Sequence, residues 1–289
     1  MKKRHTLGFS LALLLGLCTS ALAQAPTPPP RYIQIYREDV KPGRVAGHEK
    51  YEAGWPRAFA KANWPTPYVA FTSITGPLEA WFVATYDSFD AWEKDQKAMT
   101  ANATLTAESD RLSAGDAEFI SGYRSFVARY RQDLSHRPGV EMPKQRYLSI
   151  TIVRVRPGHN PDYEEYRKII KAAHEKADVK DNHSVYQVLT GLPNTTFLVV
   201  TPMRSLKELD DYEQMHSQAY QDAVGDDGRA KMRELASAGF VGSDTHIYAF
   251  SPGMSYPPKA YVTADPEFWA PKPKPAPAAK SETKPPAKQ

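Results

Sequence analysis

The sequence has almost no cysteine, since Cys18 is the only one among 289 residues. It falls in an N-terminal segment, residues 1–23, that is typical of a secretory signal peptide: a basic start, a short apolar stretch and the small-residue cleavage pattern Ala21-Leu22-Ala23. The apolar stretch is too short to span a bilayer. After cleavage the chain would have no thiol, which excludes disulfides, cysteine nucleophiles and cysteine-ligated metals. We therefore expect a secreted or periplasmic protein.

The chain also lacks the short motifs of several enzyme classes. It has no glycine-rich phosphate loop, serine nucleophile elbow or HExxH motif, so the reaction classes that depend on them lose support. The net charge of +4 comes from the basic residues at positions 2–4 and from a lysine-rich C-terminal tail that begins at Pro271. The rest of the chain, here called the body, has a net charge of −3. A mildly acidic body argues against nucleic-acid binding.

The C-terminal segment, residues 259–289, is predicted to be a disordered tail with no transmembrane anchor. From Pro271 onward it is rich in proline, alanine and lysine, and such a composition cannot bury enough surface to offset the entropy of ordering. It is interpreted as a solvated spacer, with weak contact to anionic envelope polymers as the alternative. The aromatic residues between Ala260 and Trp269 are candidates for packing back on the body.

Self-comparison reveals an internal repeat. At an offset of 115, residues 31–82 match residues 146–197 at 14 of 52 positions, where chance would give about 3. The matches include Pro42-Gly43 with Pro157-Gly158 and Thr75-Gly76 with Thr190-Gly191, and the register resumes at offset 120 further on. After a linker at 24–30, the sequence therefore predicts repeat 1 at residues 31–140 and repeat 2 at residues 141–258.

Each repeat predicts the order strand–helix–strand–strand–helix–strand. In repeat 2, alternating β-branched residues indicate strands at 147–155, 184–189, 196–200 and 245–250, and Tyr163 to Ala177 follow helical spacing. Ser205 is the predicted cap of the second helix. In repeat 1, Gly54 and Pro56 are expected to interrupt or delay the first helix. The fold class is α+β, with two tandem ferredoxin-like βαββαβ modules.

A four-stranded sheet with both helices on one side leaves its other apolar face bare, and a second module can cover it. The arrangement resembles the dimeric α+β barrel superfamily in a fused, single-chain form. The opening strand, Pro-Gly turn and helix, and the Thr-Gly hairpin, resemble NIPSNAP-like domains most. This resemblance implies a pseudo-dimeric barrel whose ligands lie between helices and sheet within one module. Members include cofactor-free monooxygenases, haem-degrading enzymes, haem peroxidases and small isomerases, and the fold alone does not choose among them.

Candidate site residues gather in repeat 2. Tyr166 and His174 share one helix, Tyr212, His216 and Tyr220 are spaced i, i+4, i+8 on the second, and His246 and Tyr248 alternate on the last strand. If these faces converge, His216 and His174 are the candidate bases or haem ligands, and the tyrosines and His246 are candidate ligand-binding residues. The alternative is that these histidines are hydrogen-bonded structural residues. Repeat 1 has Phe59 and Phe126 in place of His174 and His246.

Two further sets of residues were weighed. Trp55, Trp64, Trp81 and Trp92, with Tyr36, Tyr51 and Tyr68, either line an apolar pocket in repeat 1 or form its core. His174, Asp178, Asp181 and His183 lack the paired spacing of a zinc or calcium motif, so we assign no metal site.

Two functions follow from these features. The first is an exported protein that binds a small apolar or aromatic molecule. If this protein is an enzyme, we expect it to be an oxygenase or a haem-linked enzyme. The second is a non-catalytic envelope or interaction protein tethered by its basic tail.

Overall fold

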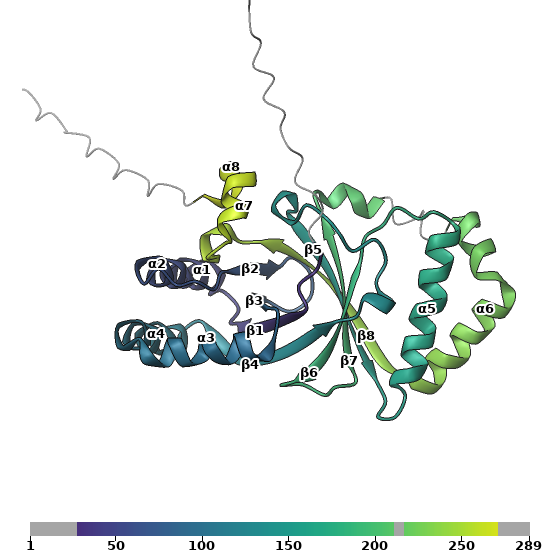
Figure 1. Ribbon diagram of the computed structural model, residues 1–289, viewed down its shortest axis with the longest axis horizontal. Helices are drawn as coiled ribbons and strands as arrows, with labels where there is room; N and C mark the ends of the chain where they lie inside the picture. Colours follow the sequence, from purple (N-terminus) through teal and green to yellow (C-terminus); the bar gives the residue numbers. More distant parts are fainter. Residues whose placement is uncertain (1–27, 211–216, 271–289) are drawn as a thin grey trace, which may run out of the picture.

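The computed structural model describes residues 28–210 and 217–270 (Figure 1). Module 1 contains β1 (Tyr32–Val40), α1 (Val45–Glu52), α2 (Gly54–Lys61), β2 (Tyr68–Ser73), β3 (Glu79–Tyr86), α3 (Phe89–Ala101), α4 (Ala103–Asp116) and β4 (Ile120–Tyr130). Module 2 contains β5 (Tyr147–Val155), α5 (Asn160–Lys176), β6 (Ser184–Thr190), β7 (Thr196–Met203), α6 (Gln218–Gly239) and β8 (Phe240–Phe250). Two short helices, α7 (Lys259–Ala264) and α8 (Pro266–Trp269), follow. The predicted βαββαβ order thus occurs twice, with some helices divided.

The eight strands form one closed barrel in the order β1-β3-β2-β8-β5-β7-β6-β4. Each module contributes four neighbouring antiparallel strands, and the modules join where β2 pairs with β8 and β4 pairs with β6. Helices α1 to α4 cover one side of the barrel, and α5 and α6 cover the opposite side (Figure 1). The predicted pseudo-dimeric α+β barrel is therefore confirmed.

The barrel interior is the main apolar core. Ile35 and Trp81 of module 1 meet Ile150 and Tyr248 of module 2 there, and each of these side chains is at most 2% exposed. Side chains that alternate with them along each strand face the helices instead. One sheet face therefore closes the barrel, and the other is left to form sites with the helices.

A buried carboxylate lies among these aromatic residues. Glu79 accepts hydrogen bonds from Trp81 Nε1 (3.0 Å) and the Tyr248 hydroxyl (3.1 Å), and it pairs with Arg37. Burial alone would raise the pKa of Glu79, but these donors outweigh it and hold the pKa below its usual value. The group is a hydrogen-bonded network that joins strands of both modules.

The C-terminal boundary of the body differs from the prediction. Residues 259–270 belong to the folded part, because Trp269 is 1% exposed, joins the barrel core and donates from Nε1 to the carbonyl oxygen of Pro143 at 2.8 Å. The expectation that aromatics before Pro271 pack on the body is thus confirmed. The predicted signal peptide and residues 271–289 lie outside the described residues. Among the described helices, none is long and apolar enough to cross a membrane.

Two element boundaries in module 2 also differ. The second helix starts after Ser217, whose Oγ accepts from Tyr220 N (3.3 Å), and Ser205 is followed instead by a short 3₁₀ turn. β8 starts at Phe240 rather than at Thr245. Its first residues are largely exposed and polar, so hydrophobic alternation does not reveal them, but pairing with β5 extends the strand. In module 1 the predicted break is confirmed, because α1 ends at Glu52 and α2 begins at Gly54.

Gly191 lies at the seam where β6 of module 2 pairs with β4 of module 1. Its φ is +90°, and a Cβ there would lie 2.2 Å from the Ser125 carbonyl oxygen on β4. Gly158 has a similar φ of +88° but open space around it. Because only Gly191 combines positive φ with a backbone clash, we expect Gly191→Ala to cost about 3 kcal/mol or more and Gly158→Ala about 1–2 kcal/mol. Urea unfolding measures both, and equal losses would contradict the close packing at this seam.

Candidate functional site

Each module has a cavity between its helices and the outer face of its half of the barrel. The cavity in module 2 has a volume of about 660 Å³, and the one in module 1 has about 590 Å³. They occupy equivalent positions in the two modules. We describe the module 2 cavity first, because the candidate residues from the sequence gather there.

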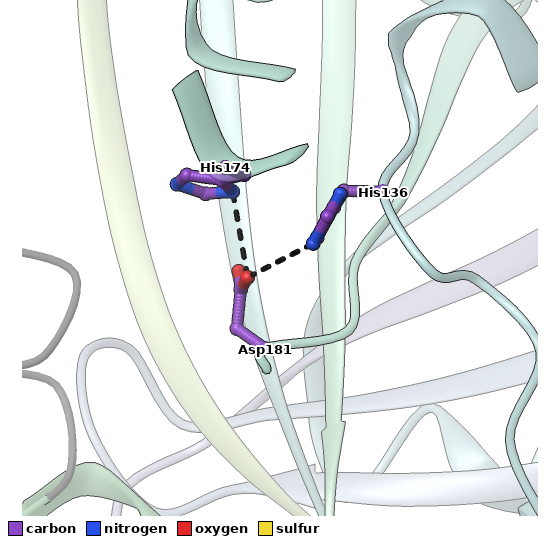
Figure 2. A group of neighbouring side chains, drawn as sticks. All are labelled: His136, His174 and Asp181. Atoms are coloured by element: carbon purple, nitrogen blue, oxygen red, sulfur yellow. Dashed lines mark ion pairs between the residues drawn. The ribbon is translucent and has the colours of Figure 1, made fainter. Parts of the chain in front are cut away.

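One wall of the module 2 cavity carries a group of buried polar residues, here called the histidine cluster: His136, His174, Asp181 and His183. His174 lies in the last turn of α5, and Asp181 and His183 lie in the loop before β6. His136 follows β4 of module 1, and its backbone exchanges two hydrogen bonds with that of His183 (3.1 and 3.0 Å). Figure 2 shows His136 and His174 pointing toward the Asp181 carboxylate. The cluster therefore contains residues from both modules.

Hydrogen bonds fix the ring states of two of the histidines. Arg167 Nη2 donates to His183 Nε2 (2.6 Å), so the proton of a neutral His183 lies on Nδ1, which donates to Asp181 Oδ2 (3.1 Å). His136 Nε2 donates to the carbonyl oxygen of Val179 (3.0 Å). The Arg167 charge balances that of Asp181. This cluster therefore has no excess negative charge to attract a cation, although the positions of its atoms alone would allow one.

His174 is the least constrained member of the cluster. Its Nδ1 lies 3.4 Å from Asp181 Oδ1, and both atoms are buried without a hydrogen-bond partner. Catalytic hydrogen bonds are often this long before substrate binds. Burial lowers the pKa of His174 to about 4, against the opposing effect of Asp181, and burial also lowers the pKa of His183. His174 is therefore a neutral imidazole at neutral pH, on the wall of a cavity.

The structure brings only some of the predicted residues together. Tyr166 and Tyr220 line the cavity with His174, and the Tyr220 ring lies 5.1 Å from the His174 ring. Tyr212 and His216 lie outside the described residues. Asp178 is not part of the cluster, because it is exposed and pairs with Lys180.

Tyr248 and His246 do not join this cavity. The Tyr248 ring is in the barrel interior, and His246 packs against Gly76 in the β2–β3 turn. Both side chains point to the inner face of β8, whereas Ser243 on the outer face lines the cavity. The prediction that the helix and strand faces converge in one pocket is wrong for these two residues.

The aromatic residues of module 1 divide between a cavity and a core. Trp55 and Trp64 line the module 1 cavity together with Tyr36 and Tyr68. Trp81 belongs to the barrel interior, while Trp92 on α3 packs on Phe89 (5.8 Å between ring centroids) and Tyr51 packs on Phe119 (5.5 Å). Both interpretations of this set are thus correct, each for some of its members.

His136 and Arg167 were not among the candidates from the sequence. Alignment of the repeats gives a signal for the histidines, because His136, His174 and His183 correspond to Tyr256, Phe59 and Tyr68. The contacts within each set follow the same pattern. The Phe59 ring meets Tyr68 edge-on (5.7 Å) and stacks on Tyr256 (6.0 Å), and the His174 ring lies near His183 (5.6 Å) and His136 (5.2 Å). Module 2 thus has three histidines where module 1 has three aromatic residues.

Comparison with known proteins identifies the fold. No family model and no curated protein sequence match the chain. An anthrone oxidase-like protein is 11% identical with a TM-score of 0.52, over 77% of this chain and 92% of that one. A protein from Fusobacterium nucleatum subsp. nucleatum, provisionally named a monooxygenase, is also 11% identical with a TM-score of 0.50, over 76% and 92%. This chain has a dimeric α+β barrel fold. At such low identity the likeness extends to the fold and not to the reaction.

The buried, neutral state of His174 predicts a pH effect on stability. Its folded pKa of about 4 lies below the ordinary 6.5, so as pH falls the unfolded chain is protonated first. The stability contribution is therefore full above about pH 6.5 and is lost as pH falls toward 4. We expect His174→Phe, which introduces the residue found at the equivalent position of module 1, to lower the slope of unfolding free energy against pH. The reason is that up to about one fewer proton is taken up on unfolding. Urea unfolding between pH 4 and 7 measures it. The control is His246→Phe on the other sheet face, and an equal effect there would contradict the assignment.

Proposed function

We propose that the protein is an enzyme that binds a small apolar or aromatic molecule in the module 2 cavity, and that His174 removes a proton from it in an oxygenase-type reaction. The observation that carries this proposal is the neutral imidazole of His174, on the cavity wall with a carboxylate facing its Nδ1. A general base needs a free lone pair at working pH and a group that stabilises its protonated form. His174 and Asp181 supply these two properties.

The cavity lining indicates the substrate class. Ile170, Val199 and Met232 provide apolar contacts, and the rings of Tyr166 and Tyr220 provide flat surfaces. Arg167, Lys180 and Arg229 also line the cavity, so a phenolate, enolate or carboxylate oxygen would find a cation. An aromatic molecule with an acidic C–H or O–H group fits this combination.

Each residue of the cluster has a role in the proposed proton transfer. With Nδ1 directed at Asp181, the other ring nitrogen of His174 accepts the proton. Asp181 then stabilises the imidazolium, and it is held in place by His183, whose orientation depends on Arg167. Loss of a proton from a benzylic carbon that is activated by a conjugated carbonyl gives a carbanion that reacts directly with O₂, so the reaction needs no cofactor.

Haem is a second candidate for the same cavity, and the donor set fits it. A haem-ligating histidine typically has its Nδ1 proton directed to a carboxylate or carbonyl, as His174 has with Asp181. Arg167, Lys180 and Arg229 would hold the propionates. His174 would bind the iron, and haem held in this way would supply one-electron and oxygen chemistry.

Three expectations from the sequence accompany this proposal. The residue matches between the repeats support a tandem duplication. The Pro-Gly turn before the first helix and the Thr-Gly hairpin support a resemblance to NIPSNAP-like domains. The chain is exported, which N-terminal sequencing of the extracytoplasmic protein would check. The tail beyond residue 270 is a solvated spacer, with weak envelope contact as the alternative, and the non-catalytic tethered protein is the alternative to the enzyme.

The proton-transfer proposal predicts activity on an aromatic carbon acid. Anthrone is a suitable probe because it reacts with O₂ to give anthraquinone and water, and because one structural neighbour is named anthrone oxidase-like. We expect the protein to accelerate oxygen uptake and His174→Gln to reduce kcat by about 100-fold, the scale of general-base catalysis. Phe59→Gln, at the equivalent position in module 1, is the matched control and should change kcat by less than about twofold. Equal rates for wild type and His174→Gln would refute His174 as the base.

The haem alternative predicts a spectroscopic signal. Titration of the metal-free protein with haemin should give a saturable Soret band at one haem per chain, and His174→Gln should weaken binding by about tenfold or more. Phe59→Gln is again the control. A Soret band that is identical in wild type and His174→Gln would exclude His174 as the iron ligand.

A further inference from the structure

The module 1 cavity has a polar group of its own, here called the carboxylate cluster: Glu38, His48, Glu52 and Asp116. Glu38 is on β1, His48 and Glu52 are one turn apart on α1, and Asp116 ends α4. One ligand atom from each residue lies within 4.8 Å of the others. The four side chains converge from three elements on one point at the wall of the cavity, which Glu38, Glu52 and Asp116 line.

This cluster is deeply buried and contains three carboxyl groups but only one basic side chain. Glu38 is 9% exposed, His48 1%, Glu52 2% and Asp116 5%. Among the ion pairs of the described residues, His48 is the only basic partner of these carboxylates, at 2.9 Å from Glu38 Oε2 and 3.8 Å from Asp116 Oδ1. Buried charges in proteins are normally paired or bound to a metal ion, and here three carboxylates face one imidazole.

Buried polar atoms at this cluster and in the wall of its cavity lack hydrogen-bond partners. Asp116 Oδ1 faces His48 inside the cluster, and the Tyr68 hydroxyl lies in the wall of the same cavity. An unpartnered buried acceptor costs about 1–3 kcal/mol, and a bound cation would satisfy it. The unpartnered carboxylate oxygen therefore indicates a site that lacks a positively charged partner.

Module 2 shows that the fold does not require these residues. With the offsets of the repeat, Glu38, His48, Glu52 and Asp116 correspond to Val153, Tyr163, Arg167 and Ala236. Val153 and Tyr163 belong to an ordinary apolar cluster there. None of the four equivalent positions carries a carboxylate, and Arg167 is the only charged residue among them, so the fold alone does not require the carboxylate cluster.

We propose that the carboxylate cluster binds one divalent first-row transition-metal ion, with Glu38, His48, Glu52 and Asp116 as its ligands. A single ion at about 2.1 Å from each ligand atom holds those atoms about 3–4 Å apart. The 4.8 Å limit therefore needs only small side-chain rotations. Carboxylate oxygens suit Mn²⁺ and imidazole suits Fe²⁺ and Zn²⁺, so the mixed set favours a transition ion over Mg²⁺ or Ca²⁺. The ion would be reached from the cavity, and this proposal is independent of the module 2 reaction.

Metal titration of the full chain tests the site. After removal of bound ions with a chelator, isothermal titration with Mn²⁺, and separately with Zn²⁺, should show saturable binding of one ion per chain. Glu52→Gln keeps the shape of the side chain but removes a carboxylate ligand, and it should weaken binding by about 100-fold. Loss of a residue that only hydrogen-bonds to a metal ligand already costs about 10–100-fold in affinity. Asp181→Asn alters the other histidine-containing cluster and should leave the affinity unchanged.

Thermal unfolding provides a second measurement, and it also shows whether each variant is folded. Mn²⁺ should raise the Tm of wild type and Asp181→Asn and leave that of Glu52→Gln unchanged, because only binding to the native state stabilises it. The proposal is overturned if neither ion binds saturably up to millimolar concentration. It is equally overturned if Glu52→Gln binds as well as wild type, or if Asp181→Asn abolishes binding.

Discussion

The whole structure depends on closing the barrel, because each four-stranded half has helices on one face only. The inner faces can be buried only against each other, and the seams β2–β8 and β4–β6 bring them together. Closure also determines where the sites form. The segment after β4 crosses to module 2 and delivers His136, and the segment after β8 crosses to module 1 and delivers Tyr256. His136 thus joins His174 and His183 in the histidine cluster, and Tyr256 packs on Phe59 in module 1. An isolated half would lack these contacts.

Much of this fold could be predicted from the sequence. The repeat and the strand alternation located the elements of module 2 and the need for a second sheet, because burial imposes those patterns directly. The start of β8 was missed because Val241, Ser243 and Asp244 are exposed and interrupt the hydrophobic alternation, while pairing with β5 extends the strand to Phe240. Residues 259–270 were assigned to the tail because proline-rich composition dominates that region, although one buried tryptophan fixes it to the barrel end.

The candidate site was predictable only in part. Helical spacing placed Tyr166 and His174 correctly, because both side chains lie on the sheet-facing side of α5. Strand alternation correctly put His246 and Tyr248 on one side of β8. It does not distinguish the face toward the helices from the face toward the barrel interior, and the two side chains lie on the interior face. Arg167 and His136 were missed because their roles depend on contacts with His183, and His136 comes from the other module. The carboxylate cluster was missed for the same reason, since three separate elements assemble it.

Glu52 and Arg167 occupy matching positions, yet one lies among carboxylates and the other among histidines. In an assembly of two identical subunits every substitution is made twice, so a carboxylate gained by one cavity would be imposed on both. A single chain that encodes both halves is free of that constraint. Each cavity can then diverge in charge, hydrogen bonding and ligand preference while the shared barrel keeps the same geometry. Two chemically different sites in one molecule are the consequence of breaking that internal symmetry.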